Sequence, residues 1–110
     1  MKLLGGSDTS HGNVYFFNRP VCDDGWSIED GNVTCRELGF PGAESVTTAS
    51  FFGPAYSEFS ASNVQCNGDE LRLEDCPRKD ETQTYCTMKE VAGVYCKTED
   101  RGKQDLLFHQ

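Results

Sequence analysis

Six cysteines are the residues of this sequence with the most definite chemistry. An even number in a chain of 110 residues predicts three disulfides, which form in oxidising compartments. A zinc site is the alternative, but zinc-binding cysteines usually come in pairs about two to four residues apart. Here the closest neighbours are ten positions apart. We therefore expect a disulfide-stapled domain that uses Cys22, Cys35, Cys66, Cys76, Cys86 and Cys96.

Two adjacent carboxylates, Asp23 and Asp24, are the best local candidate for a cation site. Adjacent carboxylates repel each other, and a sequence tolerates this at the surface or uses it around a cation. Calcium takes about six to eight oxygen ligands, mostly from carboxylates, carbonyls and water. The alternative is structural: Asp23 caps a turn and Asp24 is solvated.

The residues available for catalysis are few. A Ser–His–acid arrangement needs a well-placed histidine, and His11 and His109 lie near the chain ends, outside any catalytic motif. Disulfides would remove every thiol nucleophile. Paired carboxylates can cleave glycosides, but so small a cysteine-rich domain is not expected to hold a deep pocket. We therefore expect a protein that binds rather than catalyses.

The charge distribution limits the partners. The formal net charge is −8, which argues against nucleic acids and anionic membranes. Residues 1–70 hold ten acids against three bases, whereas residues 71–110 hold eight against seven. No stretch is long enough to cross a bilayer, and residues 1–8 do not form a signal peptide. We expect an excised piece of a larger secreted or membrane-anchored protein, located outside the cell.

Hydrophobic spacing indicates the elements that position these residues. A helix is predicted over residues 27–38, with Ser27 as N-cap and Gly39 after its end. A shorter helix is predicted over 70–76, before Pro77. Short strands are expected near 14–17, 21–22, 45–48, 64–66 and 91–96. The stretch 41–63 has the composition of a long loop.

Several short motifs occur in a fixed order along the chain. They are Val21-Cys22-Asp23-Asp24-Gly25-Trp26, Val33-Thr34-Cys35-Arg36-Glu37-Leu38-Gly39-Phe40, Phe52-Gly53, Asn63-Val64-Gln65-Cys66-Asn67-Gly68-Asp69-Glu70 and Ala92-Gly93-Val94-Tyr95-Cys96. With the opening Leu3-Leu4-Gly5-Gly6, this ordered set resembles the scavenger receptor cysteine-rich (SRCR) domain in its six-cysteine (group A-like) variety. The resemblance covers residues 2–97 and leaves 98–110 as a polar C-terminal tail or linker.

The resemblance implies a fold and a pairing that cysteine counting leaves open, since six cysteines allow fifteen connectivities. The implied fold is α+β: a small disulfide-rich domain in which a curved, mostly antiparallel sheet cradles one main helix. The implied bridges are Cys22–Cys86, Cys35–Cys96 and Cys66–Cys76.

The resemblance also implies two divalent-cation sites. The first aligns Asp23, Asp24 and Glu90 with the family's acidic ligands and points to weakly bound Ca²⁺. Its alternative is that Glu90 pairs with Lys89 or Arg36. The second, weaker site retains only Asn63 and Glu70 as ligands, and Glu70 has the alternative role of an acid at a helix N-terminus. No organic cofactor is expected.

Other residues are candidates for surface roles. Trp26 is expected in the core, and Asn32 begins the chain's glycosylation sequon on an exposed helix face. A basic patch for polyanions competes with a mixed, solvated surface. The possible ligand-contact residues are Phe51, Phe52, Tyr56, Phe59, Arg78 and Lys79.

Two function classes remain in competition. The first is an extracellular ligand-recognition module for a protein or a polyanion, with divalent-cation dependence as an added feature. The second is an accessory structural domain that positions a neighbouring part of a larger secreted or membrane-anchored enzyme or receptor. In the second case the parent protein carries catalysis in a separate domain. An independent disulfide-rich effector is a third alternative, disfavoured because no protruding inhibitory loop is identified.

Overall fold

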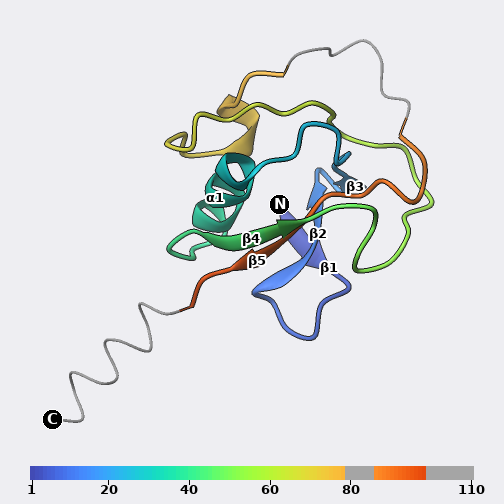
Figure 1. Cartoon of the computed structure of the whole chain (residues 1–110), viewed down its shortest axis with the longest axis horizontal. Helices are drawn as coiled ribbons and strands as arrows, with labels where there is room; N and C mark the ends of the chain where they lie inside the picture. Colours follow the sequence, from blue (N-terminus) through green and yellow to red (C-terminus); the bar gives the residue numbers. More distant parts are fainter. Residues whose placement is uncertain (79–85, 99–110) are drawn as a thin grey trace, which may run out of the picture.

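The computed structural model describes residues 1–78 and 86–98 and contains one antiparallel sheet with one α-helix beside it (Figure 1). The strands are β1 (Lys2–Leu4), β2 (His11–Phe16), β3 (Arg19–Pro20), β4 (Ala43–Thr47) and β5 (Gly93–Cys96). Their order is β1-β2-β5-β4, and β3 pairs with β2 outside this path. The helix α1 (Ile28–Glu37) packs against β4 and β5. The α+β fold expected from the family resemblance is confirmed.

Three disulfides hold these elements together. Cys35–Cys96 joins α1 to β5, and Cys22–Cys86 joins the segment after β3 to the segment before β5. Cys66–Cys76 closes a short loop around the 3₁₀ helix η1 (Leu73–Asp75). These are the pairs that the family resemblance implies.

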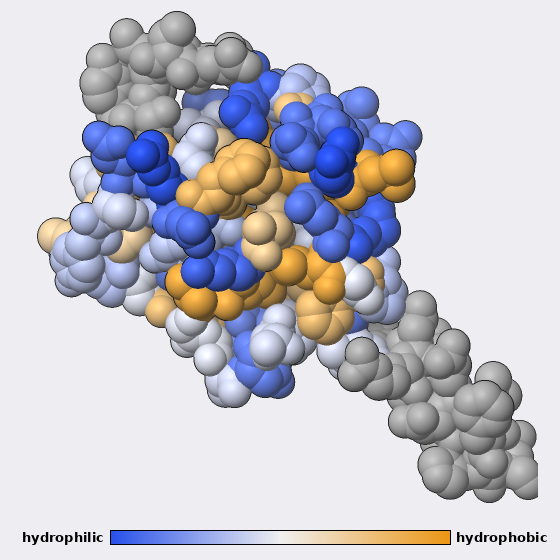
Figure 2. Space-filling model, turned by 180° about the vertical axis from the view of Figure 1, so that it is seen from behind, coloured by the Kyte–Doolittle hydropathy of each residue, from blue (hydrophilic) through white to orange (hydrophobic). Residues whose placement is uncertain are grey.

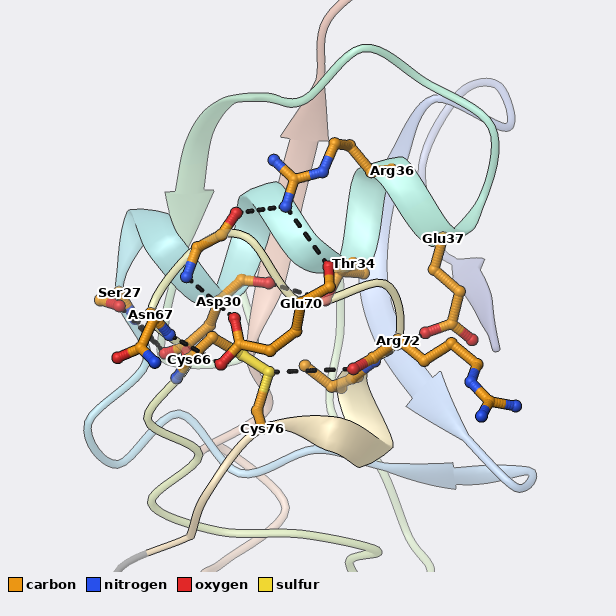
Figure 3. Close-up of a disulfide and its surroundings, with 12 residues drawn as sticks. Ser27, Asp30, Thr34, Arg36, Glu37, Cys66, Asn67, Glu70, Arg72 and Cys76 are labelled. Carbon is orange, nitrogen blue, oxygen red and sulfur yellow. Dashed lines mark hydrogen bonds between the residues drawn. A yellow bond between two sulfur atoms is a disulfide. The ribbon is translucent and has the colours of Figure 1, made fainter.

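The predicted second helix over 70–76 is wrong in type and length. The structure has only the three-residue η1 there, and Glu70 lies in the turn before it. The Glu70 carboxylate accepts the backbone N–H groups of Asn67 at 2.9 Å and Gly68 at 3.0 Å (Figure 3). Because these donors, Asn67 first, favour the charged form, they lower the pKa of Glu70. Glu70 therefore closes a turn, and within the described residues no α-helix begins there.

Two glycines explain how closely α1 and the sheet approach each other. A Cβ on Gly31, inside the helix, would lie 2.6 Å from Val46 Cγ1, so only glycine lets α1 rest on β4. A Cβ on Gly93 would lie 3.2 Å from Phe52 Cδ2 and still closer to the Thr47 hydroxyl. The glycine of the closing motif therefore leaves the room that Phe52 occupies on the other side of the sheet.

The core is small and mostly aliphatic, with Trp26 at its edge. Trp26 is buried, and its Nε1–H donates to the Gly93 carbonyl at 3.0 Å, which agrees with its expected core position. No helix in the described residues is long and apolar enough to cross a membrane.

Asp30 is the one fully buried carboxylate among the described residues, and it connects α1 to the Cys66 segment (Figure 3). Its Oδ2 accepts the backbone N–H of Ser27 at 2.8 Å and the Ser27 hydroxyl at 3.0 Å, which closes the helix N-terminus as a capping box. Its Oδ1 accepts the Cys66 N–H at 2.7 Å. One side chain thus caps the helix and fixes a loop 36 residues away in sequence.

Asp30 makes stability depend on pH. Burial is the largest influence on its carboxyl group and raises the pKa of Asp30 above 3.8, although the bonds from Cys66 and Ser27 oppose the rise. The folded state therefore holds the proton more tightly than the unfolded chain. The contribution of Asp30 to the free energy of unfolding is greatest below pH 3.8 and falls as pH rises through its folded pKa.

Urea unfolding between pH 3 and pH 7 tests this dependence. Asp30→Asn does not titrate at this position. As pH rises, the free energy of unfolding of the wild type is expected to fall relative to that of Asp30→Asn. A difference that grows in favour of the wild type over the same range would mean that the three hydrogen bonds outweigh burial.

Candidate functional site

The Cys22–Cys86 bridge brings two carboxylates from distant segments to one point. Carboxylate oxygens of Asp24 and Glu90 lie, with the two bridge sulfurs, within 4.8 Å of one another. Asp24 is exposed and Glu90 is half-buried. The Glu90 Oε1 already accepts the Thr87 N–H at 2.9 Å. Because disulfide sulfur is not a metal ligand, Asp24 and Glu90 are the residues of this cluster that could hold a cation.

Asp23 lies outside the cluster that brings Asp24 and Glu90 together, and the three-carboxylate site that the family resemblance implies stays a prediction. The Asp23 Oδ2 accepts the backbone N–H of Ala49 at 2.6 Å. Its own N–H donates to the Glu90 carbonyl at 2.9 Å, and its carbonyl accepts the Trp26 N–H at 3.0 Å. Asp23 is thus a structural link between the acidic pair and the segment after β4.

Of the two residues proposed for the second cation site, Glu70 is engaged in a turn. Glu70 closes the turn at Asn67 and Gly68, as described above. Asn63 has a φ of 53° and places its Oδ1 beside Gly25. The second cation site stays a prediction.

Residues 49–53, here called the aromatic loop, have an unusual backbone. Ala49 and Ser50 have φ values of 56° and 52°, in the left-handed region that residues with a side chain rarely adopt. Such residues cost about 1–3 kcal/mol each and persist where the surroundings hold them. Here the Asp23 carboxylate holds Ala49 through a hydrogen bond, and several hydrogen bonds hold Ser50.

Ser50 is tied to the segment before β5 at three points. Its N–H donates to the Val91 carbonyl at 3.1 Å, and its hydroxyl donates to the Met88 carbonyl at 2.8 Å. The Val91 N–H donates back to the Ser50 Oγ at 3.0 Å. At the other end of the loop, the Asn13 side-chain amide donates to the Gly53 carbonyl at 2.8 Å. The loop conformation is therefore fixed by hydrogen bonds from three separate segments.

The aromatic loop places its two phenylalanines differently. Phe51 is 63% exposed, whereas Phe52 is half-buried over Gly93. The two rings meet edge to face at 5.0 Å, and Phe52 lies 5.3 Å from the Tyr95 ring. His11 stacks on Tyr95 at 5.0 Å. These four rings form a continuous aromatic cluster on the sheet face opposite α1.

Two further aromatic residues follow the aromatic loop in the sequence, and other apolar side chains are also exposed. Tyr56 is 83% exposed and Phe59 is half-buried. Figure 2 shows apolar residues gathered across the middle of one face, with hydrophilic residues around them. The other large, exposed apolar residues are Leu4, Phe17, Ile28, Leu71 and Met88.

His11 has contacts that resemble a catalytic triad without its function. The Ser7 Oγ lies 2.9 Å from Nε2, and the Asp8 carboxylate lies 3.4 Å from Nδ1. However, Nε2 also accepts the backbone N–H of Ser7 at 3.1 Å. That bond uses the single lone pair that a general base needs. The Ser10 hydroxyl and N–H hold the Asp8 carboxylate and lower the pKa of Asp8. The arrangement therefore stabilises a turn.

Three of the described arginines, Arg19, Arg36 and Arg72, are engaged within the domain. Arg19 pairs with Glu58 at 3.5 Å, and Arg72 lies 3.2 Å from Glu74. Arg36 donates to the Gly68 and Glu70 carbonyls rather than pairing with Glu90 (Figure 3). Arg78 is half-buried, and Lys79 lies outside the described residues. The described part of the chain thus favours a mixed surface over a basic patch.

Asn32 is less exposed than its place on the helix predicts. It is half-buried, and its Oδ1 accepts the backbone N–H of Ala43 at 2.8 Å. The helical period predicts an exposed face at Asn32. After Gly39, however, the chain turns back and covers part of this face. Glycosylation at Asn32 stays a prediction.

A small domain with one sheet, one helix and this cysteine pairing is typical of a class of extracellular modules. Comparison with known protein families identifies the class. Residues 4–97 match the family described as the scavenger receptor cysteine-rich domain, and this chain belongs to that family. Domains of this family are generally non-catalytic, extracellular ligand-recognition modules.

Similar proteins include domains of much larger chains. The sequence is 37% identical over 100 residues to a scavenger receptor cysteine-rich domain superfamily protein of Patiria pectinifera, covering 87% of this chain and 9% of that protein. It is 35% identical over 111 residues to lysyl oxidase homolog 3A of Danio rerio, covering 97% of this chain and 15% of that protein. The chain therefore spans less than a sixth of the length of either relative.

Solved structures show the same fold. The third SRCR domain of murine neurotrypsin superposes with a TM-score of 0.78 at 33% identity, covering 86% of this chain and 92% of that domain. The dimeric form of the SRCR domain of mouse MARCO gives a TM-score of 0.68 at 30% identity, covering 88% and 94%.

Proposed function

We propose that this domain recognises a protein ligand outside the cell and that a calcium ion held by Asp24 and Glu90 supports the binding. The observation that carries this proposal is the convergence of the two carboxylates at an exposed point. Asp23 links that point directly to the aromatic loop, which presents Phe51 to solvent. Exposed aromatic side chains are enriched in protein-binding surfaces, and the rim around them is polar.

The two carboxylates fit a weak calcium site. Within the described residues no hydrogen bond engages the Asp24 carboxylate, and Glu90 offers Oε2 because its Oε1 accepts the Thr87 N–H. Water would complete the coordination shell, and sites with so few protein ligands bind calcium with Kd values of about 10⁻⁴ to 10⁻³ M. A bound calcium ion would supply a positive charge next to a surface that is otherwise acidic.

A protein ligand is favoured over a polyanion by the charges. The formal net charge is −8, and Arg19, Arg36 and Arg72 are all engaged within the described part of the domain. A polyanion would therefore be repelled by the acidic part of the surface.

The second candidate is an accessory domain that positions a catalytic neighbour. It is favoured by the match to lysyl oxidase homolog 3A, in which the matched region is a small part of the chain. An accessory domain of this kind needs no ligand of its own. The binding measurements below distinguish the two candidates because they use the isolated domain.

Calcium is expected to stabilise the folded domain. At 10 mM calcium, a site with a Kd of about 1 mM stabilises the folded state by about 1.4 kcal/mol. In a domain of this size that shift raises the melting temperature by several degrees. Thermal unfolding followed by circular dichroism, with calcium or with EDTA, measures the effect.

Two variants make this test specific. Asp24→Asn is expected to abolish the calcium-dependent rise, because it removes the charge of the exposed ligand. Asp69→Asn, which removes an acid outside the pair, is expected to keep the full rise. An equal calcium response in the wild type and Asp24→Asn would refute the site.

A further inference from the structure

The aromatic loop combines an exposed phenylalanine with a backbone that is held in place before any ligand arrives. Its left-handed residues, Ala49 and Ser50, are fixed by Asp23, Met88 and Val91 through the hydrogen bonds given above. An anchor that is already ordered loses less conformational entropy on binding than a flexible one. The 63% exposed ring of Phe51 is therefore well suited to serve as a docking anchor.

The surroundings of Phe51 select a cationic partner. Its ring lies 5.0 Å from Phe52 and 6.4 Å from Tyr95, so the exposed ring stands within an aromatic surface. Faces of aromatic rings attract lysine and arginine side chains. Apolar contacts alone would bind any hydrophobic side chain equally, whereas the ring faces favour a cationic one.

Carboxylates border this aromatic surface. Asp8 lies 3.4 Å from the His11 ring that stacks on Tyr95, and Asp23 lies at the base of the loop. Within residues 1–78 and 86–98, Asp23, which lies outside the proposed calcium pair, has no lysine or arginine within 4.0 Å. Its negative charge at the base of the loop complements the aromatic attraction.

We propose that the aromatic loop is the docking surface for a protein segment that presents a lysine or arginine side chain to the ring of Phe51. This inference rests on the proposed protein-recognition function and names the class of partner. It does not require calcium at Asp24 and Glu90. The partner is thus a basic segment of another protein, not a polyanion, a membrane or a second copy of this domain.

A defined peptide pair tests the inference by NMR in the presence of EDTA. The probe is a nine-residue peptide of glycine and serine with four lysine or arginine residues, and its control has glutamate at those four positions. The basic peptide is expected to shift the backbone amide signals of residues 49–53 and of Tyr95. The acidic peptide is expected to leave them unchanged.

Phe51→Ala is expected to weaken binding of the basic peptide by about tenfold, since truncating a central aromatic anchor typically costs at least that much. Leu71→Ala is the matched control, because Leu71 is 81% exposed in the segment before η1. It is expected to bind as the wild type does. Neither substitution removes a buried side chain, and dispersed amide spectra verify that both variants fold.

Four outcomes would overturn the inference. The first is equal peptide affinity in the wild type and Phe51→Ala, and the second is an absence of shifts in the aromatic loop. The third is a response of the loop to a heparin fragment or to phosphatidylserine vesicles. The fourth is self-association that Phe51→Ala abolishes. Because EDTA is present throughout, failure here is distinguishable from failure of the calcium site, which the melting experiment reports.

Discussion

Replacing both Cys35 and Cys96 by alanine is expected to lower the free energy of unfolding by about 4 kcal/mol. The bridge joins α1 to β5 across 61 residues of sequence, so it strongly restricts the unfolded chain. Both cysteines are buried, and shorter side chains would also leave unfilled space between helix and sheet. A loss of this size is a large part of the total stability of a small domain.

The Cys66–Cys76 bridge is the internal comparison. It closes only 10 residues, and its removal is expected to cost about 3 kcal/mol, less than the helix-to-strand bridge. Urea unfolding of the wild type and the two double-alanine variants measures which bridge contributes more to the free energy of unfolding. If the short bridge contributes more than the long one, chain entropy is not the dominant effect of these disulfides.

Asp30→Ala is expected to destabilise the domain by about 3 kcal/mol, because three donors lose their acceptor together. They are the N–H and hydroxyl of Ser27 and the N–H of Cys66. The fully buried position keeps water from replacing the carboxylate. Both the first turn of α1 and the Cys66 segment should lose protection from amide hydrogen exchange.

Glu29→Ala provides the control for this substitution. Glu29 is also acidic and lies in the first turn of α1, but it is exposed. Its replacement is expected to change stability by at most about 0.5 kcal/mol. Asp30→Asn should fall between the two, because an amide keeps one acceptor oxygen. Equal effects of Asp30→Ala and Glu29→Ala would show that charge at the helix N-terminus matters more than the buried hydrogen bonds.

The main helix was predictable because its signals are local. Ser27 before the first turn and Gly39 after the last one indicate the same span that the structure shows for α1, within one residue at each end. The second helix failed because its decisive contacts are not periodic. Glu70 turns back onto two N–H groups, and the disulfide at Cys76 ends the segment.

The candidate site was only partly predictable. The family resemblance implies the Cys22–Cys86 pair, and this pair places Asp24 beside Glu90. Nothing in the sequence indicates that Asp23 turns to the N–H of Ala49. That bond depends on the left-handed backbone at Ala49, and such a conformation leaves no mark in a stretch of ordinary residues.

The exposure of the loop aromatics illustrates the same limit. Phe51 and Phe52 are neighbours of identical type, yet one is exposed and the other packs over Gly93. Their difference arises from the bonds that fix Ser50 against the β5 segment. The sequence indicates that some of these rings are buried, and tertiary contacts decide which.

The calcium site proposed at Asp24 and Glu90 is joined to the aromatic loop through Asp23. Its most direct test is a calcium titration of the ¹⁵N-labelled domain, followed through the backbone amide signals. We predict saturable shifts in the millimolar range at Asp24 and Glu90, with smaller shifts at Ala49, because Asp23 joins the loop to the pair. Unchanged signals at Asp24 and Glu90 up to 10 mM calcium would contradict the account.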